Sequence, residues 1–260
     1  MRKFTLICKD DPTTQTLVEN IKNSLINKGW ETSDENPEVV ISVGGDGTFL
    51  RAIHTHQDHL QNCFFVGIHT GTLGFLTNYA SDECEELIED IEKASVNLVE
   101  LPLLEVCVET EGTCRTVYAV NEMRIENVIR TQLLDVSING QRLETFRGNG
   151  LCVSTQVGST AYNRSLGGAI IHEGINAMQL TEITGIHHHA YRSLGSPLIL
   201  SEKSIITLES DNFNQAILCY DYLSLPLNQK TRLTVSYSQR KAKLMIRDKK
   251  SYIDRLKSLF

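Results

Sequence analysis

The stretch Val39–Thr48, with the sequence VVISVGGDGT, decides what the first part of this chain can form. Apart from Ser42, its first five residues are β-branched and apolar, as is typical of a strand buried on both faces of a parallel sheet. The strand is expected to end at Gly44, because the GGDG run that follows favours a turn. Phe49 and Leu50 then begin a helical pattern. The sequence therefore predicts a strand, a glycine turn and a helix in succession.

Strands and helices also alternate on both sides of this stretch. A strand is expected at Lys3–Cys8, followed by a helix that begins with an Asp11 cap and a first-turn proline and stops at Gly29. A second apolar run, Phe64–Ile68, leads into another glycine-rich segment, Gly71–Phe75. The runs Val39–Val43 and Phe64–Ile68 each end at a glycine-rich segment, as buried strands of an α/β domain do.

A further helix is expected after the second glycine-rich segment. Ser81 is its predicted N-cap, and Leu87, Ile88 and Ile91 fall on its buried side. The repeated order of strand, loop and helix over residues 1–100 indicates an α/β domain with an open, mostly parallel sheet.

From about residue 101 the apolar residues alternate with polar ones, which is the period of strands. An Asn139-Gly140 pair between two such runs is a strong hairpin signal. We therefore expect a β-rich domain over residues 101–246 and a tail, residues 247–260, that can pack on the first domain. The expected strands are Leu104–Val108, Val117–Ile125, Leu134–Ile138, Leu151–Ser154, Ser204–Leu208, Ala216–Cys219, Thr231–Ser238 and Lys241–Ile246.

Composition excludes several classes of protein. The 260 residues include 25 Lys and Arg against 32 Asp and Glu, a formal net charge of −7, which argues against general nucleic-acid binding. The 41% hydrophobic fraction excludes long disorder. No run approaches the ~18 apolar residues of a membrane span, and no leader pattern is present, so we expect a cytoplasmic protein without a membrane partner.

Cysteine and histidine spacing predicts no metal site. The seven cysteines are widely spaced without a C-x-x-C pair, so we expect reduced thiols, mostly in the core, rather than a disulfide framework. The three consecutive histidines at 187–189 point in different directions on any regular element and cannot easily share one ion.

The glycine turn Gly44–Thr48 has the features of a phosphate-binding loop. Glycines let the backbone approach a ligand closely, and a helix start offers N–H groups and a positive dipole end. The turn matches neither the Walker motif nor the dinucleotide fingerprint. Asp46 has two interpretations: a helix cap, or a carboxylate that positions Mg²⁺ or accepts a proton during phosphoryl transfer.

Two later segments are suited to a nucleoside. Phe146–Ser165 contains a strand flanked by glycines that exposes hydroxyl and backbone groups, and Ser159 is expected to donate a hydrogen bond, because GST is not a nucleophile elbow. Asn121 and Glu122 lie within the run Val117–Ile125, where neighbours face opposite ways. The pair could hold the two hydroxyls of a ribose, or be a surface Glu beside a turn-forming Asn.

Taken together, these motifs resemble the NAD kinase family, in its compact bacterial form, over nearly the whole chain. The motifs are GGDGT at 44–48, GTLGF at 71–75, NE at 121–122, ST at 154–155, GSTAY at 158–162 and GGA at 167–169. The resemblance implies an α/β domain, a β-rich domain, and transfer of the γ-phosphate of ATP, or of a polyphosphate phosphate, to the 2′-hydroxyl of the adenosine ribose of NAD. It also implies Mg²⁺ or another divalent cation and a homodimer or homotetramer.

The resemblance assigns roles residue by residue. Asp46 matches the proposed catalytic aspartate. The phosphate-binding positions are Gly44, Gly45, Gly47 and Thr48. The NAD-binding positions are Gly47, Phe75, Asn121, Glu122, Arg147, Asn149, Thr160, Ala161, Tyr162, Asn163, Arg164, Ser165, Thr184, His187, Tyr191 and Tyr222.

Two positions depart from the family pattern. Asn149 stands in an RGNG run where the family usually has RGDG, and Gln156 stands where Pro is common. Loss of a carboxylate that would face the positive nicotinamide end predicts weaker NAD binding. Two other readings stay open at this point: a non-catalytic protein that binds or senses NAD, and a lipid or nucleoside kinase that shares only the GGDG loop.

Overall fold

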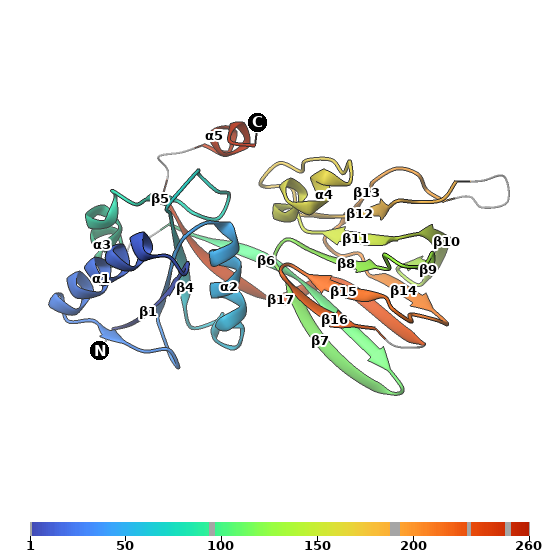
Figure 1. Cartoon of the computed structure of the whole chain (residues 1–260), viewed down its shortest axis with the longest axis horizontal. Coiled ribbons are helices and arrows are strands. Elements are labelled where there is room, and N and C mark those ends of the chain that lie inside the picture. The colour runs from blue at the N-terminus through green and yellow to red at the C-terminus, as the bar shows by residue number, and fades with distance from the viewer. Residues whose placement is uncertain (1, 94–96, 188–192, 228–229, 248–250, 260) are drawn as a thin grey trace. The chain divides into compact units, whose positions relative to one another are not determined.

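The computed structural model describes residues 2–93, 97–187, 193–227, 230–247 and 251–259 (Figure 1). The chain divides into two compact units. The first consists of residues 1–101 and 240–260, and the second of residues 102–239. Two long strands, β6 (Asn97–Thr110) and β17 (Thr231–Ile246), contribute residues to both units.

The first unit is built on a parallel sheet, as the sequence predicts. Its strand order is β17-β4-β3-β1-β2, with β5 paired to β4, and every described pairing among these strands is parallel. The buried β3 matches its predicted bounds without change. The strands are β1 (Lys3–Cys8), β2 (Glu31–Thr32), β3 (Val39–Val43), β4 (Phe64–His69) and β5 (Tyr79–Ala80).

Helices cover both faces of this sheet (Figure 1). Helices α1 and α3 pack on the face that carries Ile41 and Val66, whereas Phe49 of α2 packs on Phe65 at the opposite face. The helices are α1 (Pro12–Asn27), α2 (Asp46–Thr55), η1 (Gln57–His59), α3 (Cys84–Glu92) and α5 (Tyr252–Lys257). No helix in the described part of the chain is long and apolar enough to cross a membrane.

The predicted start of α1 is confirmed, and that of α3 is wrong. The Asp11 carboxylate accepts a hydrogen bond from the backbone N–H of Thr14, as an N-cap should. Helix α3 begins at Cys84 with Glu83, not Ser81, as its N-cap. The physical reason is the Glu83 carboxylate, which accepts a hydrogen bond from the N–H of Ala80 and closes a turn that includes Ser81.

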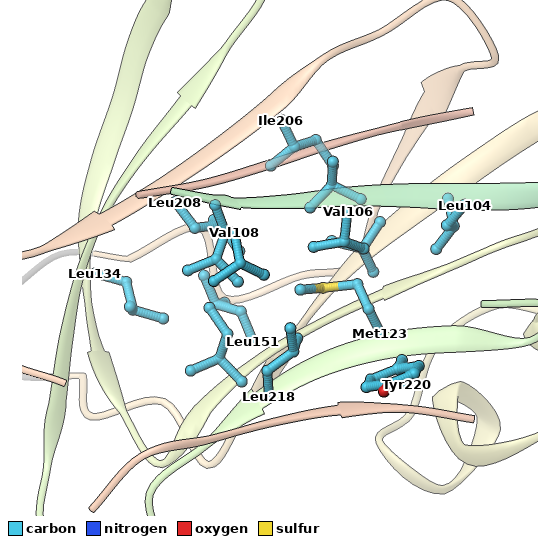
Figure 2. Packing of buried hydrophobic residues seen from close by; sticks show 14 of the residues in the cluster. Leu104, Val106, Val108, Met123, Leu134, Leu151, Ile206, Leu208, Leu218 and Tyr220 are labelled. Carbon is cyan, nitrogen blue, oxygen red and sulfur yellow. The ribbon is translucent and has the colours of Figure 1, made fainter. Parts of the chain in front are cut away.

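The second unit consists of strands from two sheets. One set contains β10-β9-β14-β17 and the hairpin β6–β7, and the other has the order β13-β12-β11-β8-β15-β16. Apolar side chains between them form a core, in which Leu104, Met123 and Leu218 point toward one another (Figure 2). The other strands are β7 (Thr113–Ala119), β8 (Glu122–Glu126), β9 (Gln132–Ile138), β10 (Gln141–Gly148), β11 (Gly150–Ser154), β12 (Ala177–Ile183), β13 (Leu198–Ser201), β14 (Ile206–Ser210), β15 (Ile217–Tyr220) and β16 (Leu223–Pro226).

The predicted strand Val117–Ile125 is two strands. The chain leaves β7 after Ala119 and enters β8 at Glu122, because the carboxylate of Asp221 accepts hydrogen bonds from the N–H groups of Val120 and Asn121. The strands predicted at Thr231–Ser238 and Lys241–Ile246 are a single strand, and β12, β13 and β16 were not predicted. These elements depend on partners that lie far away in the sequence.

The expectation that all cysteines are reduced is wrong for one pair. Cys107 and Cys114 form a disulfide between β6 and β7, with their Cα atoms 6.0 Å apart. The hairpin brings them together: Glu111 and Gly112 form its turn with φ values of 50° and 80°, and Cys114 pairs with Glu109. Of the other five, Cys63 and Cys152 are buried, and Cys8, Cys84 and Cys219 are partly exposed.

Candidate active site

Asp46 is the first residue of α2, and its carboxylate is held by a second loop. Oδ2 accepts a hydrogen bond from the N–H of Phe75 at 2.9 Å, and Oδ1 accepts one from Leu76 at 3.0 Å. The N-cap of α2 is Gly45, which makes no side-chain cap bond. The interpretation of Asp46 as a helix cap is therefore wrong, because its side chain joins the two glycine-rich loops instead.

The surroundings of Asp46 shift its proton affinity in opposite directions. Burial raises the pKa of its carboxyl above the ordinary value, while the amides of Phe75 and Leu76, and then Arg255 and His69, oppose that rise. A partly buried carboxylate with a raised pKa, fixed by two amides, has the character of a proton acceptor in a site.

The glycines around Asp46 divide into close contacts and open positions. A Cβ on Gly74 would lie 2.1 Å from Asp46 Oδ1, and one on Gly44 would lie 2.3 Å from Thr48 Oγ1. A Cβ on Gly45 or Gly47 would meet nothing within 4 Å. The glycine loop is thus packed on its inner side and open where its backbone N–H groups begin the helix, which suits a phosphate.

Helix α5 braces the loop that holds Asp46. A guanidinium nitrogen of Arg255 donates to Asn78 Oδ1 at 3.0 Å, and the hydroxyl of Ser258 donates to the carbonyl of Leu73 at 3.2 Å. The rings of Phe75 and Tyr252 meet edge to face with centroids 6.2 Å apart. Phe75, predicted beside adenine, therefore lies between the Asp46 carboxylate and the tail of the chain.

In the second unit, Asn121 and Glu122 lie at the start of β8. Glu122 is only 4% exposed, and its Oε2 has no hydrogen-bond partner among the described residues. Burial, and next the nearby charge of Asp221, raise the pKa of Glu122 to about 7. The interpretation of Glu122 as a surface residue is therefore wrong, whereas the contact of Asn121 and Glu122 with a ribose stays a prediction.

The segment that follows β11 folds into two short helices beside Glu122. It consists of η2 (Val157–Thr160) and α4 (Tyr162–Ser165). Thr160, Ala161 and Tyr162 are partly exposed, and Arg164 and Ser165 are exposed, so these predicted NAD contacts are accessible from solvent.

Asn163 and Ser159 are buried residues of this same segment. Asn163 is fully buried and accepts a hydrogen bond from the hydroxyl of Thr181 at 2.7 Å, and its predicted contact with NAD stays a prediction. Ser159 is also buried, and its hydroxyl accepts from the N–H of Ile171 at 3.0 Å. Ser159 thus takes part in hydrogen bonding within the fold.

A third group of predicted residues gathers at the end of β10. Arg147 accepts a backbone hydrogen bond from Ile186, and the carbonyl of Thr184 would lie 2.6 Å from a Cβ on Gly148. His187 Nε2 lies 3.6 Å from the carboxylate of Glu182. Arg147, Thr184 and His187 therefore belong to one region of the second unit.

Asn149 has a structural role that an Asp could not fill. Its Nδ2 donates to the carbonyl of Asn127 at 3.2 Å. A carboxylate has no hydrogen to donate and would face a carbonyl oxygen. Tyr222, half exposed, follows Asp221 in the turn between β15 and β16. Tyr191 lies outside the described residues, as do His188 and His189.

The site fits a divalent cation that arrives with its nucleotide. Among the described residues, no group of three or more His, Cys, Asp or Glu side chains could hold a metal ion. Mg²⁺ commonly binds through one or two carboxylates together with substrate phosphates and water, and the Asp46 carboxylate beside an open phosphate loop meets that need.

Both halves of the chain match models of one family. Residues 3–96 match the ATP-NAD kinase N-terminal domain, and residues 120–247 match the ATP-NAD kinase C-terminal domain. The chain belongs to the NAD kinase family. An NAD kinase 1 of Bacillus subtilis (strain 168) is 43% identical over 226 residues, which cover 86% of this chain and 85% of the relative. An NAD kinase 1 of Bacillus anthracis is 40% identical over 225 residues with the same coverage.

Solved NAD and NADH kinases share the fold. A yeast NADH kinase complexed with NADH has a TM-score of 0.84 at 19% identity, covering 99% of this chain and 86% of that one. An NAD kinase from Archaeoglobus fulgidus in complex with ATP has a TM-score of 0.78 at 24% identity, covering 100% and 98%. The predicted α/β unit with a β-rich partner is thereby confirmed as the NAD kinase fold.

Several residues of this NAD kinase site were not found from the sequence. Leu76 donates a hydrogen bond to Asp46, Arg255 braces the loop that contains Leu76, and Arg124 lies among the carboxylates of β8. Of these residues, only Arg124 could have been found from the sequence, because Glu122, Arg124 and Glu126 alternate in charge on one face of a strand.

Proposed function

We propose that this chain transfers the γ-phosphate of ATP to the 2′-hydroxyl of the adenosine ribose of NAD, which gives NADP and ADP. The geometry of Asp46 carries the proposal: a partly buried carboxylate, fixed by two backbone amides, stands at the first turn of a helix beside open glycines. Family membership supports the same reaction, and it does not favour the lipid kinase, nucleoside kinase or sensor readings.

Each part of the reaction then has a group to carry it. The Asp46 carboxylate accepts the proton of the 2′-hydroxyl as that oxygen attacks the γ-phosphorus. The bond from the γ-phosphorus to the β–γ bridging oxygen breaks, and ADP leaves with those electrons. The N–H groups at the start of α2, with Gly44, Gly45, Gly47 and Thr48, bind phosphate oxygens. A bound Mg²⁺ would offset the charge of the phosphates.

Residues of the second unit are proposed to bind NAD. The Glu122 carboxylate oxygen that lacks a partner is a strong acceptor for a ribose hydroxyl, and Asn121 lies beside it. Phe75 in the first unit offers an apolar ring for adenine. Thr160–Ser165, Arg147, Asn149, Thr184, His187, Tyr191 and Tyr222 complete the proposed set.

An assay of NADP formation tests the proposal. Purified protein is supplied with NAD, Mg²⁺ and either ATP or polyphosphate, and Asp46→Asn is run beside it. We expect kcat of Asp46→Asn to fall by at least about 1,000-fold, since the amide cannot accept the proton. An Asn side chain also faces two N–H donors with a single acceptor, so thermal unfolding is measured on the same samples.

The outcomes are distinct. A folded Asp46→Asn variant that keeps wild-type turnover contradicts the role of Asp46. A wild-type protein that binds NAD without forming NADP from either donor supports the sensor reading instead.

We also propose a cytoplasmic homodimer or homotetramer. Val128 and Ile129 are 77% and 67% exposed in a loop ordered by the Asn127 side chain, as suits residues buried on assembly. Light scattering on the protein and on Val128→Ser/Ile129→Ser tests assembly, and a monomeric wild type would contradict it.

A further inference from the structure

Strand β8 places three charged side chains on one face. Glu122, Arg124 and Glu126 alternate along it, so all three point the same way. Arg124 Nε lies 2.6 Å from Glu126 Oε1, and its Nη1 lies 3.6 Å from Glu122 Oε1. At most a fifth of each of these side chains is exposed. The strand thus carries a partly buried row of acid, base and acid.

All three side chains engage Tyr162, the first residue of α4. The Glu122 carboxylate accepts a hydrogen bond from the N–H of Tyr162, and the Tyr162 hydroxyl donates to Glu126. The Arg124 guanidinium carbon lies 4.2 Å from the centroid of the Tyr162 ring. A cation over an aromatic face at this distance is attracted to it. Backbone, ring and hydroxyl of Tyr162 are therefore each fixed by a different residue of β8.

Arg124 also offsets the negative charge at this position. Asp221 raises the pKa of Glu122, and Arg124 is the cation that opposes this rise, while Glu126 and Glu122 both interact with Arg124. The thiols of Cys152 and Cys219 flank Arg124 on the two neighbouring strands, at the pairing positions opposite it. A partly buried row of this kind depends on its central charge, because an uncompensated carboxylate there is costly.

We infer that Arg124 is a positioning residue for the nucleoside. It fixes the ring of Tyr162 and balances the charge of Glu122, so that both side chains are oriented to contact NAD. This inference rests on the proposed function, in which Glu122 and Tyr162 touch the dinucleotide. Arg124 itself acts through these two residues and is not a catalytic residue.

The pH dependence of binding follows from the charges that face Glu122. Burial and Asp221 raise its pKa to about 7, and Arg124 lowers it. The other facing groups are Tyr162 from α4, Cys152 from β11 and Cys219 from β15. Removing the cation raises the pKa of Glu122 further. An ionised Glu122 accepts the ribose hydroxyl, so affinity for NAD falls as the pH is lowered and Glu122 becomes protonated. Without the Arg124 cation this fall should begin at a higher pH than in wild type.

The test measures the Kd for NAD by calorimetry, without a phosphate donor, from pH 6 to 9, together with kcat and both KM values. For Arg124→Gln we expect a Kd about 10-fold weaker at pH 7.5. The pH below which affinity declines should also move upward. The value of kcat at saturating NAD and the KM for ATP should stay within threefold of wild type.

Two further variants separate the parts of this role. Arg124→Lys keeps the charge and loses the planar guanidinium, so we expect a weaker Kd with the wild-type pH profile. Arg142→Gln is the matched control, because Arg142 also pairs with a carboxylate from a strand, at 3.5 Å from Asp135, but is largely exposed. It should leave both Kd and its pH profile unchanged.

An unchanged Kd in Arg124→Gln, or a loss of affinity by the same factor at every pH, would overturn the inference. If Arg124→Gln does not fold, Arg124→Lys decides, and a wild-type Kd in that variant overturns it. A wild-type protein that neither binds nor phosphorylates NAD refutes the proposed function instead, whereas an active wild type with an insensitive position 124 refutes only the role of Arg124.

Discussion

Two carboxylates, Asp46 in the first unit and Glu122 in the second, are held in different ways. Asp46 is fixed by backbone N–H groups of Phe75 and Leu76, which belong to a loop that glycine allows to approach. Glu122 is surrounded by charged side chains, with Arg124 beside it and Asp221 nearby. Backbone N–H groups are kept in every substitution except one to proline and do not titrate, whereas side-chain charges can be changed singly.

The contrast predicts two kinds of sensitivity. The Asp46 site should tolerate many changes of side chain and fail where a new atom enters the close approach between the loops. The Glu122 site should accept changes in shape and respond to changes in charge and pH. Rigid placement suits Asp46, which must accept one proton. Adjustable surrounding charge suits Glu122, which is proposed to set the affinity for NAD.

Among the substitutions that test this contrast, Gly74→Ala should have the largest effect. The added Cβ would lie 2.1 Å from Asp46 Oδ1, so the loop or the carboxylate must move. We expect kcat to fall by at least about 100-fold, since small displacements of a catalytic group have effects of this size. Gly71→Ala is the matched control, because its Cβ meets nothing within 4 Å and activity should stay within twofold. Equal activities in the two variants would show that the contact has no role.

Glu122→Gln should increase stability while it weakens NAD binding. The folded-state pKa of about 7 lies above the ordinary value of 4.5, so the folded protein binds this proton more tightly than the unfolded chain. The stabilisation is full below about pH 4.5 and is lost as the pH rises through 7. At pH 8 the variant should therefore unfold with a free energy about 2 kcal/mol higher.

Chemical denaturation between pH 5 and 8 measures this difference. The slope of stability with pH that wild type shows in that range should flatten in Glu122→Gln. Glu209→Gln, which removes an exposed carboxylate 3.6 Å from Arg232, should change neither quantity. A variant that is less stable than wild type at pH 8 would contradict the raised pKa.

Asn149→Asp should have the smallest effect: it should strengthen NAD binding and lower the stability of the fold. A carboxylate facing the nicotinamide end should lower the KM for NAD by about 5-fold. Loss of the hydrogen bond from Asn149 Nδ2 to the carbonyl of Asn127 should lower stability by about 1 kcal/mol. Steady-state kinetics and thermal unfolding on one preparation measure both, and a KM that does not fall would refute the first.

Elements with local signals were predicted well. Strands β1 and β3 have their expected bounds, and α1 has its expected cap, because burial pattern, capping residue and breaker all lie within a few residues of each other. The break between β7 and β8 was missed because it depends on Asp221, about a hundred residues away. The start of α3 was missed because Glu83 turns back to Ala80.

The candidate site shows the same division. The glycines that surround Asp46 can be recognised from the sequence, since few other residues allow such turns and contacts. That Asp46 binds the amides of Phe75 and Leu76 could not be predicted, because any residue carries an N–H group. The brace from Arg255 to Asn78 was equally hidden, as it joins residues 177 positions apart.

The first unit is discontinuous, and this imposes an order on its synthesis. Leu244 of β17 pairs with Phe65 of β4, and Arg255 reaches Asn78, yet both follow the entire second unit along the chain. During translation the ribosome must therefore release every strand of the second unit before the first sheet can gain its last neighbour. The polypeptide emerging from the exit tunnel carries Asp46 and its glycine loops long before Arg255, so phosphate transfer awaits the synthesis of the segment that secures them.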